Sequence, residues 1–267
     1  MISGAARGQG RSHAIRLAEE GADIIAFDIC RQIETVEYPM STADDLAETV
    51  KMVENLDRRI YAVEADVRDR DALEKLVAEG IAELGRLDIV IANAGIFPLT
   101  GAMGNSHQAW CDAIDVMLTG TYNTITATIP ALIEGGAGGS LVITNSTAGL
   151  SGLINDLERA SPGCIGYIAA KHGLVGVMQM YAKCLGPYNI RVNSVHPSAV
   201  DTLMITNEFF SRWQSDNPDG KARMQNVLPV ALLDPVDISN AILWLCSEAG
   251  RYVTGVTLPV DAGYTLR

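Results

Sequence analysis

Short apolar runs alternate with longer amphipathic stretches along the whole chain. The apolar runs, each four to six residues long, are 24–27, 61–65, 88–92, 140–144, 190–195 and 257–260. Stretches with helical features lie between them, at 42–56, 70–84, 107–133, 164–185 and 235–247. This alternation predicts an α/β fold, a Rossmann-like doubly wound parallel sheet in three layers (αβα). Ligands of such sheets bind beyond the carboxyl ends of the strands, so the polar residues that follow the runs are the first site candidates.

The first strand of this pattern is unusually short. Only Met1, Ile2 and Ser3 precede Gly4, whereas a buried central strand normally has five or six apolar residues. We therefore expect an apparently truncated first strand that lacks sheet pairing at its N-terminal end. The expected consequence is lower stability rather than a different fold.

Composition indicates a globular protein and disfavours several kinds of partner. With 48% hydrophobic and 19% charged residues, the 267 positions suffice for a single domain, 1–267, with a sizeable core. The formal net charge of −12 disfavours nucleic acid and anionic membrane surfaces. The sequence has no apolar stretch of membrane-spanning length and no signal-peptide pattern, so we expect a cytoplasmic protein.

Neither the cysteines nor the histidines are spaced as metal ligands. The five cysteines are scattered without a C-x-x-C pair, and the four histidines form no ligand pattern. We expect reduced, mostly packed thiols in a cytosolic protein, and histidines that cap or pack. No metal is predicted.

A glycine-rich turn opens the chain. Gly4, Gly8 and Gly10 form G-x-x-x-G-x-G, followed by a helical run and by a short strand that ends in Asp28. Glycines let the backbone approach a pyrophosphate at a helix N-terminus, and an acid at the end of the next strand accepts hydrogen bonds from a ribose. The order of these features favours a dinucleotide site over a merely structural turn.

Three segments are longer than the pattern requires. Residues 29–41, which contain Tyr38-Pro39, form a candidate insertion flap, and residues 203–227 suit a substrate lid. A further insertion separates Ser146 from Tyr167, and its polar residues either shape substrate choice or pack on a neighbouring subunit. These polar residues are Asn155, Asp156, Glu158 and Arg159.

Tyr167 and Lys171 are four residues apart in the predicted helix 164–185 and therefore share one helix face. A nearby ammonium stabilises a phenolate and lowers the pKa of the tyrosine, which lets it shuttle protons. The spacing alone is weak evidence, because Tyr-x-x-x-Lys also occurs by chance.

The motifs together resemble those of the short-chain dehydrogenase/reductase family along essentially the whole chain. The resemblance rests on the glycine turn, Asp66, Asn93-Ala94-Gly95, Ser146, Tyr167-x-x-x-Lys171 and the segment 191–197. It implies a nicotinamide cofactor, Tyr167 as general acid/base, Ser146 holding the substrate oxygen, and Lys171 binding the nicotinamide ribose while lowering the pKa of Tyr167. The cofactor-binding residues it implies are Gly4, Arg7, Gly8, Gln9, Gly10, Asp28, Asp66, Val67, Asn93, Ala94, Gly95, Tyr167, Lys171, Pro197, Val200 and Thr202.

More narrowly, residues 4–13, 20–26 and the excursion after Asp28 resemble the carveol dehydrogenase group, which is linked to the redox carrier mycofactocin. This resemblance implies a tightly held NAD, with segment 29–41 covering the adenosine end. It also implies a homotetramer formed by the helices 107–133 and 164–185.

Two positions depart from the family pattern. Met117 stands where an asparagine usually bends the long helix and supports a proton-carrying water, and Ser198 stands where glycine usually follows the proline. Methionine has no donor to offer, and we interpret Met117 as core filling.

The choice between NAD and NADP depends on two opposed charges. Arg7 precedes Gly8, where NADP-binding relatives often keep a basic residue, whereas Asp28 would repel a 2′-phosphate. We expect Asp28 to dominate, because an arginine on the glycine turn can swing into solvent.

The leading hypothesis is an NAD-dependent dehydrogenase of an apolar secondary alcohol, with cyclic and terpenoid alcohols as the candidates. Two alternatives stay open: an NADPH-dependent carbonyl reductase, and a non-catalytic NAD-binding scaffold or sensor.

Overall fold

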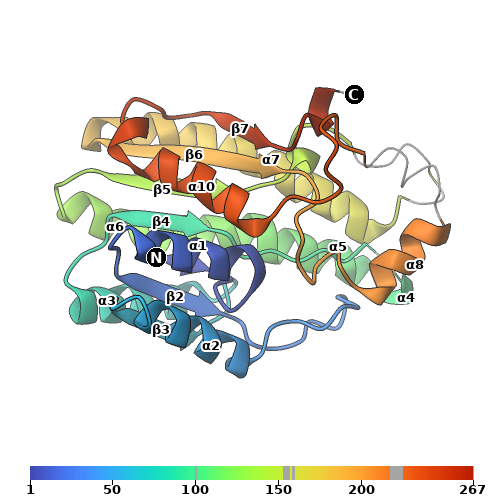
Figure 1. The fold of residues 1–267 in the computed structure, drawn as a ribbon, viewed down its shortest axis with the longest axis horizontal. Helices are drawn as coiled ribbons and strands as arrows, with labels where there is room; N and C mark the ends of the chain where they lie inside the picture. Colours follow the sequence, from blue (N-terminus) through green and yellow to red (C-terminus); the bar gives the residue numbers. More distant parts are fainter. Residues whose placement is uncertain (100, 153–156, 158–159, 217–224, 267) are drawn as a thin grey trace.

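The computed structural model describes residues 1–99, 101–152, 157, 160–216 and 225–266, and these contain a sheet of seven parallel strands in the order β3-β2-β1-β4-β5-β6-β7 (Figure 1). The predicted doubly wound sheet is confirmed. The strands are β1 (Ile2–Ser3), β2 (Ile24–Asp28), β3 (Ile60–Glu64), β4 (Ile89–Ala92), β5 (Gly139–Thr144), β6 (Ile190–Pro197) and β7 (Thr257–Val260).

Helices cover both faces of the sheet, so alternate residues of each strand enter different cores (Figure 1). In β2, Ile24 and Ala26 pack with helices α1, α2 and α10, while Ile25 and Phe27 pack with α3, α6 and α7. Burial on both faces explains the uninterrupted apolar runs. The α-helices are α1 (Gly8–Glu19), α2 (Ala43–Glu54), α3 (Arg70–Leu84), α4 (Gly101–Gly104), α5 (His107–Ala113), α6 (Gly120–Glu134), α7 (Pro162–Leu185), α8 (Glu208–Asp216) and α10 (Pro235–Cys246).

Capping residues set several helix starts. Thr42 begins α2 with a capping box that it forms with Asp45, as expected, and Asp234 does the same for α10. Ser161 caps α7, where its hydroxyl accepts a hydrogen bond from the Cys164 N–H. Among the described helices, none is long and apolar enough to cross a membrane.

Strand β1 has only two residues, as expected. Ile2 pairs with Ala26 of β2 and with Ile91 of β4, although β2 begins at Ile24 and β4 at Ile89. The start of β2 therefore extends beyond β1, which confirms the missing pairing on that side. On the other side the Met1 ammonium donates a hydrogen bond of 2.7 Å to the Ile89 carbonyl oxygen, so pairing with β4 reaches the first residue of that strand.

The segment 29–41, called the flap below, has no regular secondary structure but is packed rather than loose. Ile33, Val36 and Tyr38 are buried in the larger core cluster. The Thr35 hydroxyl donates a hydrogen bond of 2.6 Å to the buried Asp112 carboxylate on α5. The flap extends past the carboxyl end of β2, at the same end of the molecule as α8 (Figure 1).

The long helical region is interrupted where a bend was predicted. A π-helical turn at Ile114–Thr119 separates α5 from α6, which restarts at Gly120. Met117 lies in this turn and is buried in the core, which agrees with its interpretation as core filling. Of the other predicted segments, the polar insertion residues 155, 156, 158 and 159 and lid residues 217–224 lie outside the described residues.

Candidate active site

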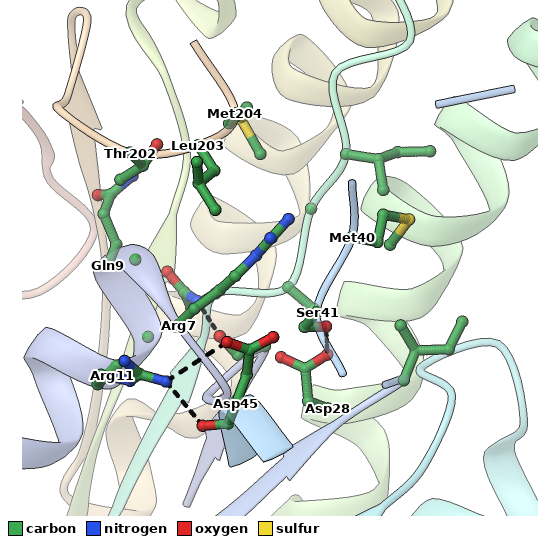
Figure 2. A pocket seen from close by; sticks show the side chains of 18 of the residues that line it. Arg7, Gln9, Arg11, Asp28, Met40, Ser41, Asp45, Thr202, Leu203 and Met204 are labelled. Carbon is green, nitrogen blue, oxygen red and sulfur yellow. Dashed lines mark hydrogen bonds and ion pairs between the residues drawn. The ribbon is translucent and has the colours of Figure 1, made fainter. Parts of the chain in front are cut away.

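A cavity of about 500 Å³ lies at the carboxyl ends of the central strands (Figure 2). Twelve of the residues predicted to bind the cofactor line it: Gly4, Arg7, Gly8, Gln9, Gly10, Asp28, Asp66, Val67, Asn93, Ala94, Gly95 and Thr202. The flap contributes Ile29, Ile33, Tyr38, Met40 and Ser41 to the same lining. The structure therefore brings the glycine turn, three strand ends and the flap around one space.

The glycine turn leaves bare backbone facing this cavity. Gly4 and Gly8 have φ values of +66° and +54°, which most other residues adopt only with strain. A Cβ at Gly4 would lie 2.9 Å from the Ala94 Cα, and one at Gly8 would lie 3.3 Å from Thr202 Cγ2. Because α1 begins at Gly8, the turn presents unpaired N–H groups at a helix N-terminus, which fits a pyrophosphate.

The Asp28 carboxylate is fixed at the end of β2. It accepts hydrogen bonds from the Ala6 N–H at 3.0 Å, the Cys30 N–H at 3.3 Å and the Ser41 hydroxyl at 2.6 Å. A carboxylate offers about four acceptor positions, so capacity remains for one more donor. The side chain is only 7% exposed but lines the cavity, which fits a ribose hydroxyl and opposes a second negative charge.

Arg7 has a partner on the flap. Its guanidinium points into the cavity, as Figure 2 shows, and donates an exposed hydrogen bond of 2.5 Å to the Pro39 carbonyl oxygen of the flap. The flap thus supplies an acceptor that the sequence did not indicate. Arg7 therefore joins the glycine turn to the flap.

Asp66 is held in an ion-pair cluster. Its carboxylate lies 2.7 Å from Arg68 and 2.8 Å from Arg31 of the flap. Burial by itself would raise the pKa of Asp66, but hydrogen bonds from the two arginines, Arg68 above all, outweigh burial and lower it. The cluster fixes one end of the flap to the end of β3.

The three predicted catalytic residues lie together, outside the lining of this cavity. Ser146 follows β5, and its side chain lies close enough to Tyr167 on α7 to lower the pKa of the phenol. The Lys171 ammonium lies 5.7 Å from the centre of the Tyr167 ring and donates a hydrogen bond of 3.0 Å to the Thr144 carbonyl oxygen. Both α7 side chains are almost fully buried, with 8% of Tyr167 and 5% of Lys171 exposed.

The expected lowering of the Tyr167 pKa is wrong for this structure. Burial raises the pKa of Tyr167 to about 12, although the nearby Ser146 side chain opposes the rise. Burial also lowers the pKa of Lys171 to about 8. Sequence spacing predicts the neighbouring charge correctly, but desolvation, which penalises both charged forms, is the larger effect.

Backbone contacts position Ser146 and Lys171. The His196 Nδ1 lies 2.8 Å from the Ser146 carbonyl oxygen, and its Nε2 lies 2.8 Å from the Ser194 hydroxyl. The Asn145 side chain donates a hydrogen bond of 3.0 Å to the Lys171 carbonyl oxygen. Sequence reasoning interpreted His196 as a capping or packing residue and did not single out Asn145, because neither contact has a sequence signal.

The remaining predicted residues lie nearby in the fold. Pro197 ends β6, Val200 forms an isolated bridge with Leu233, and Thr202 contacts the glycine turn.

Among the described residues, no group of three or more histidine, cysteine, aspartate or glutamate side chains is arranged to hold a metal ion. The five cysteines are free thiols: Cys164 is buried, Cys30, Cys111 and Cys246 are partly buried and Cys184 is exposed, which agrees with the expectation of mostly packed thiols.

Several known proteins share this architecture. A family model described as enoyl-(acyl carrier protein) reductase matches residues 4–265. A short-chain type dehydrogenase/reductase of Mycolicibacterium smegmatis is 51% identical over 277 residues, which cover 100% of this chain and 96% of that protein. The chain belongs to the short-chain dehydrogenase/reductase family.

Two further members of the short-chain dehydrogenase/reductase family are similar along their length. The (-)-trans-carveol dehydrogenase of Rhodococcus erythropolis is 45% identical over 276 residues, covering 100% of this chain and 97% of the relative. The crystal structure of carveol dehydrogenase from Mycobacterium avium in complex with NAD has a TM-score of 0.91 and 49% identity, and covers 100% of this chain and 96% of that one.

Within the short-chain dehydrogenase/reductase pattern, Ser198 has a local structural explanation. Its hydroxyl donates a hydrogen bond of 3.2 Å to the Asp261 carbonyl oxygen. The serine therefore ties the loop after β6 to the segment after β7. The change from the usual glycine is accommodated without a left-handed backbone at this position.

Proposed function

We propose that the protein is an NAD-dependent oxidoreductase that interconverts an apolar, carveol-like secondary alcohol and its ketone. The grouping of Ser146, Tyr167 and Lys171 carries this proposal. A protein that only binds a nucleotide has no need of a buried lysine and a serine side chain that both lie beside a buried tyrosine. We infer that residues 1–267 form a single domain, in which the flap and the described lid residues Leu203, Met204 and Thr206 cover the site.

Tyr167 exchanges a proton with the reacting oxygen, and the Ser146 hydroxyl aligns that oxygen. When bound, NAD supplies the hydride acceptor or donor for the carbinol carbon. With a pKa of about 12, Tyr167 holds its proton at neutral pH and is ready to donate it to a carbonyl oxygen. In the opposite direction, the positive charge of Lys171, 5.7 Å from the ring, favours the phenolate that accepts the proton.

Asp28 supports NAD rather than NADP. Its carboxylate is buried, fully ordered by three hydrogen bonds and turned toward the cavity, so it repels a 2′-phosphate without being able to move away. Arg7 has a carbonyl partner on the flap and need not bind a phosphate.

The flap supports slow exchange of the nucleotide. Contacts anchor it to four separate elements: Arg7–Pro39 to the glycine turn, Ser41–Asp28 to β2, Arg31–Asp66 to β3 and Thr35–Asp112 to α5. Opening it breaks several of these contacts together. We therefore propose a tightly bound NAD, which in turn favours an external electron acceptor of the mycofactocin type, and we place the enzyme in the cytoplasm as a homotetramer.

The experiment begins with the purified protein. Denaturation should release a nucleotide that mass spectrometry identifies as NAD. Alcohols such as carveol and cyclohexanol should be oxidised with an artificial electron acceptor or with added NAD. Tyr167→Phe should lose turnover at least about a thousandfold while its NAD content stays within about twofold of wild type.

Different outcomes separate the alternatives. NADPH-dependent ketone reduction with tighter NADP binding would support the carbonyl reductase instead. NAD binding without turnover of any alcohol or ketone would support the scaffold or sensor. Activity that survives Tyr167→Phe would refute the proposed acid/base.

A further inference from the structure

An aromatic chain connects the catalytic tyrosine with helix α8. The Phe97 ring lies 4.8 Å from the Tyr167 ring at 81°, an edge-to-face contact, and 6.1 Å from the Phe210 ring. Phe210 in turn stacks on Trp213 at 5.6 Å. Phe97 therefore lies between Tyr167 and α8, next to the position that the proposed function gives to the reacting oxygen.

The backbone of Phe97 is held by a residue of the flap. The Phe97 N–H donates a hydrogen bond of 3.2 Å to the hydroxyl oxygen of Tyr38. Tyr38 is 6% exposed and also lines the cavity. Burial raises the pKa of Tyr38, so its hydroxyl stays protonated.

The flap fixes Tyr38 from both sides. The Gln32 side chain donates to the carbonyl oxygens of Val36 at 2.6 Å and Tyr38 at 3.3 Å, and accepts from the Met40 N–H at 3.0 Å. Thr35, three residues before Tyr38, is tied to Asp112. The Tyr38 hydroxyl therefore has a defined position, and its hydrogen bond with the Phe97 N–H holds the Phe97 backbone in place.

We propose that Tyr38 is a positioning residue and Phe97 a specificity-determining residue: the flap tyrosine holds the Phe97 ring as a wall of the substrate chamber that favours cyclic apolar alcohols. This inference rests on the proposed alcohol dehydrogenase function. A ring-shaped substrate gains contact area on an aromatic wall, whereas a short acyclic alcohol reaches little of it. The flap, which we propose covers the nucleotide, thus also shapes the part of the site that binds the substrate.

The first test measures the contact itself and needs no substrate. Tyr38→Phe keeps the ring and removes only the hydroxyl, so hydrogen exchange of the Phe97 amide should accelerate about tenfold or more. Tyr61→Phe is the matched control, because Tyr61 on β3 also loses one hydroxyl hydrogen bond, 2.8 Å to Glu79, far from Phe97. An unchanged exchange rate at Phe97 in Tyr38→Phe overturns the proposal.

The second test measures selectivity in the enzyme with its bound nucleotide, whose content is checked in each variant. Tyr38→Phe should raise KM for cyclohexanol about fivefold and Phe97→Ala about tenfold, with a much smaller rise in KM for 2-propanol in both variants. The pH dependence of kcat should be unchanged in Tyr38→Phe, which keeps the Phe97 ring beside Tyr167. Equal changes for both alcohols, or none, reject the specificity role. If the wild type oxidises no alcohol, the proposed function fails, and the exchange rate alone decides whether Tyr38 positions Phe97.

Discussion

Gly10→Ala tests whether the glycine turn is shaped for close backbone approach. A Cβ at Gly10 would overlap the Gly4 carbonyl oxygen and would lie 2.7 Å from its carbonyl carbon and 2.8 Å from Asn93 Nδ2. An ordinary carbon–carbon contact is about 3.5 Å, and the overlap with the Gly4 oxygen is deeper than that with its carbon, so the two backbone segments must separate by more than about 0.8 Å. The moving groups are those that line the cavity at the start of α1.

The expected cost has two parts. Forcing a methyl group into a packed site costs about 1–3 kcal/mol, which for a chain of this size lowers Tm by roughly 2–10 °C. The displaced N–H groups also lose hydrogen bonds to a charged ligand, worth about 1.5–3 kcal/mol each, so NAD affinity should fall about tenfold to a hundredfold.

The assay compares three proteins: wild type, Gly10→Ala and Gly135→Ala. The bound NAD per subunit is measured after purification, together with Tm and NAD titration. Gly135 is the matched control because its backbone is right-handed and a Cβ there would come no nearer than 3.3 Å to any described neighbour. A Gly10→Ala protein that retains NAD within twofold of wild type would refute the reasoning about the turn.

Two further predictions concern charge. Asp28→Ala should shift the NAD-over-NADP preference by roughly tenfold or more, measured by cofactor titration; an unchanged ratio would contradict the role of Asp28. Because burial lowers the pKa of Lys171 from 10.5 to about 8, the unfolded chain binds more protons than the folded protein between these values. Lys171 therefore contributes a rise of about 3 kcal/mol to the free energy of unfolding across this window, which denaturation titrations should show as the difference in pH dependence between wild type and Lys171→Met. The difference is needed because burial raises the pKa of the Cys30, Cys164 and Cys246 thiols, which act in the opposite direction.

The flap shows where sequence reasoning stops. Its existence follows from the length between Asp28 and the Thr42 cap, but its packing does not, because irregular segments have no period from which burial can be read. Ile33, Val36 and Tyr38 enter the core through contacts with distant helices. The same applies to Arg7, whose acceptor on Pro39 is 32 residues away.

The sequence by itself determined the αβα layers, nearly all strand and helix bounds, and the gathering of the glycine turn, Asp28, Asp66 and Asn93 at one end of the sheet. These follow from local periodicity and from the common direction of parallel strands. Only the tertiary structure decided which charges prevail at the catalytic residues. Burial depends on many residues that are distant in the sequence, and it keeps the pKa of Tyr167 high and that of Lys171 low. The packing of the flap likewise places the Tyr38 hydroxyl at the backbone of Phe97, which contacts Tyr167.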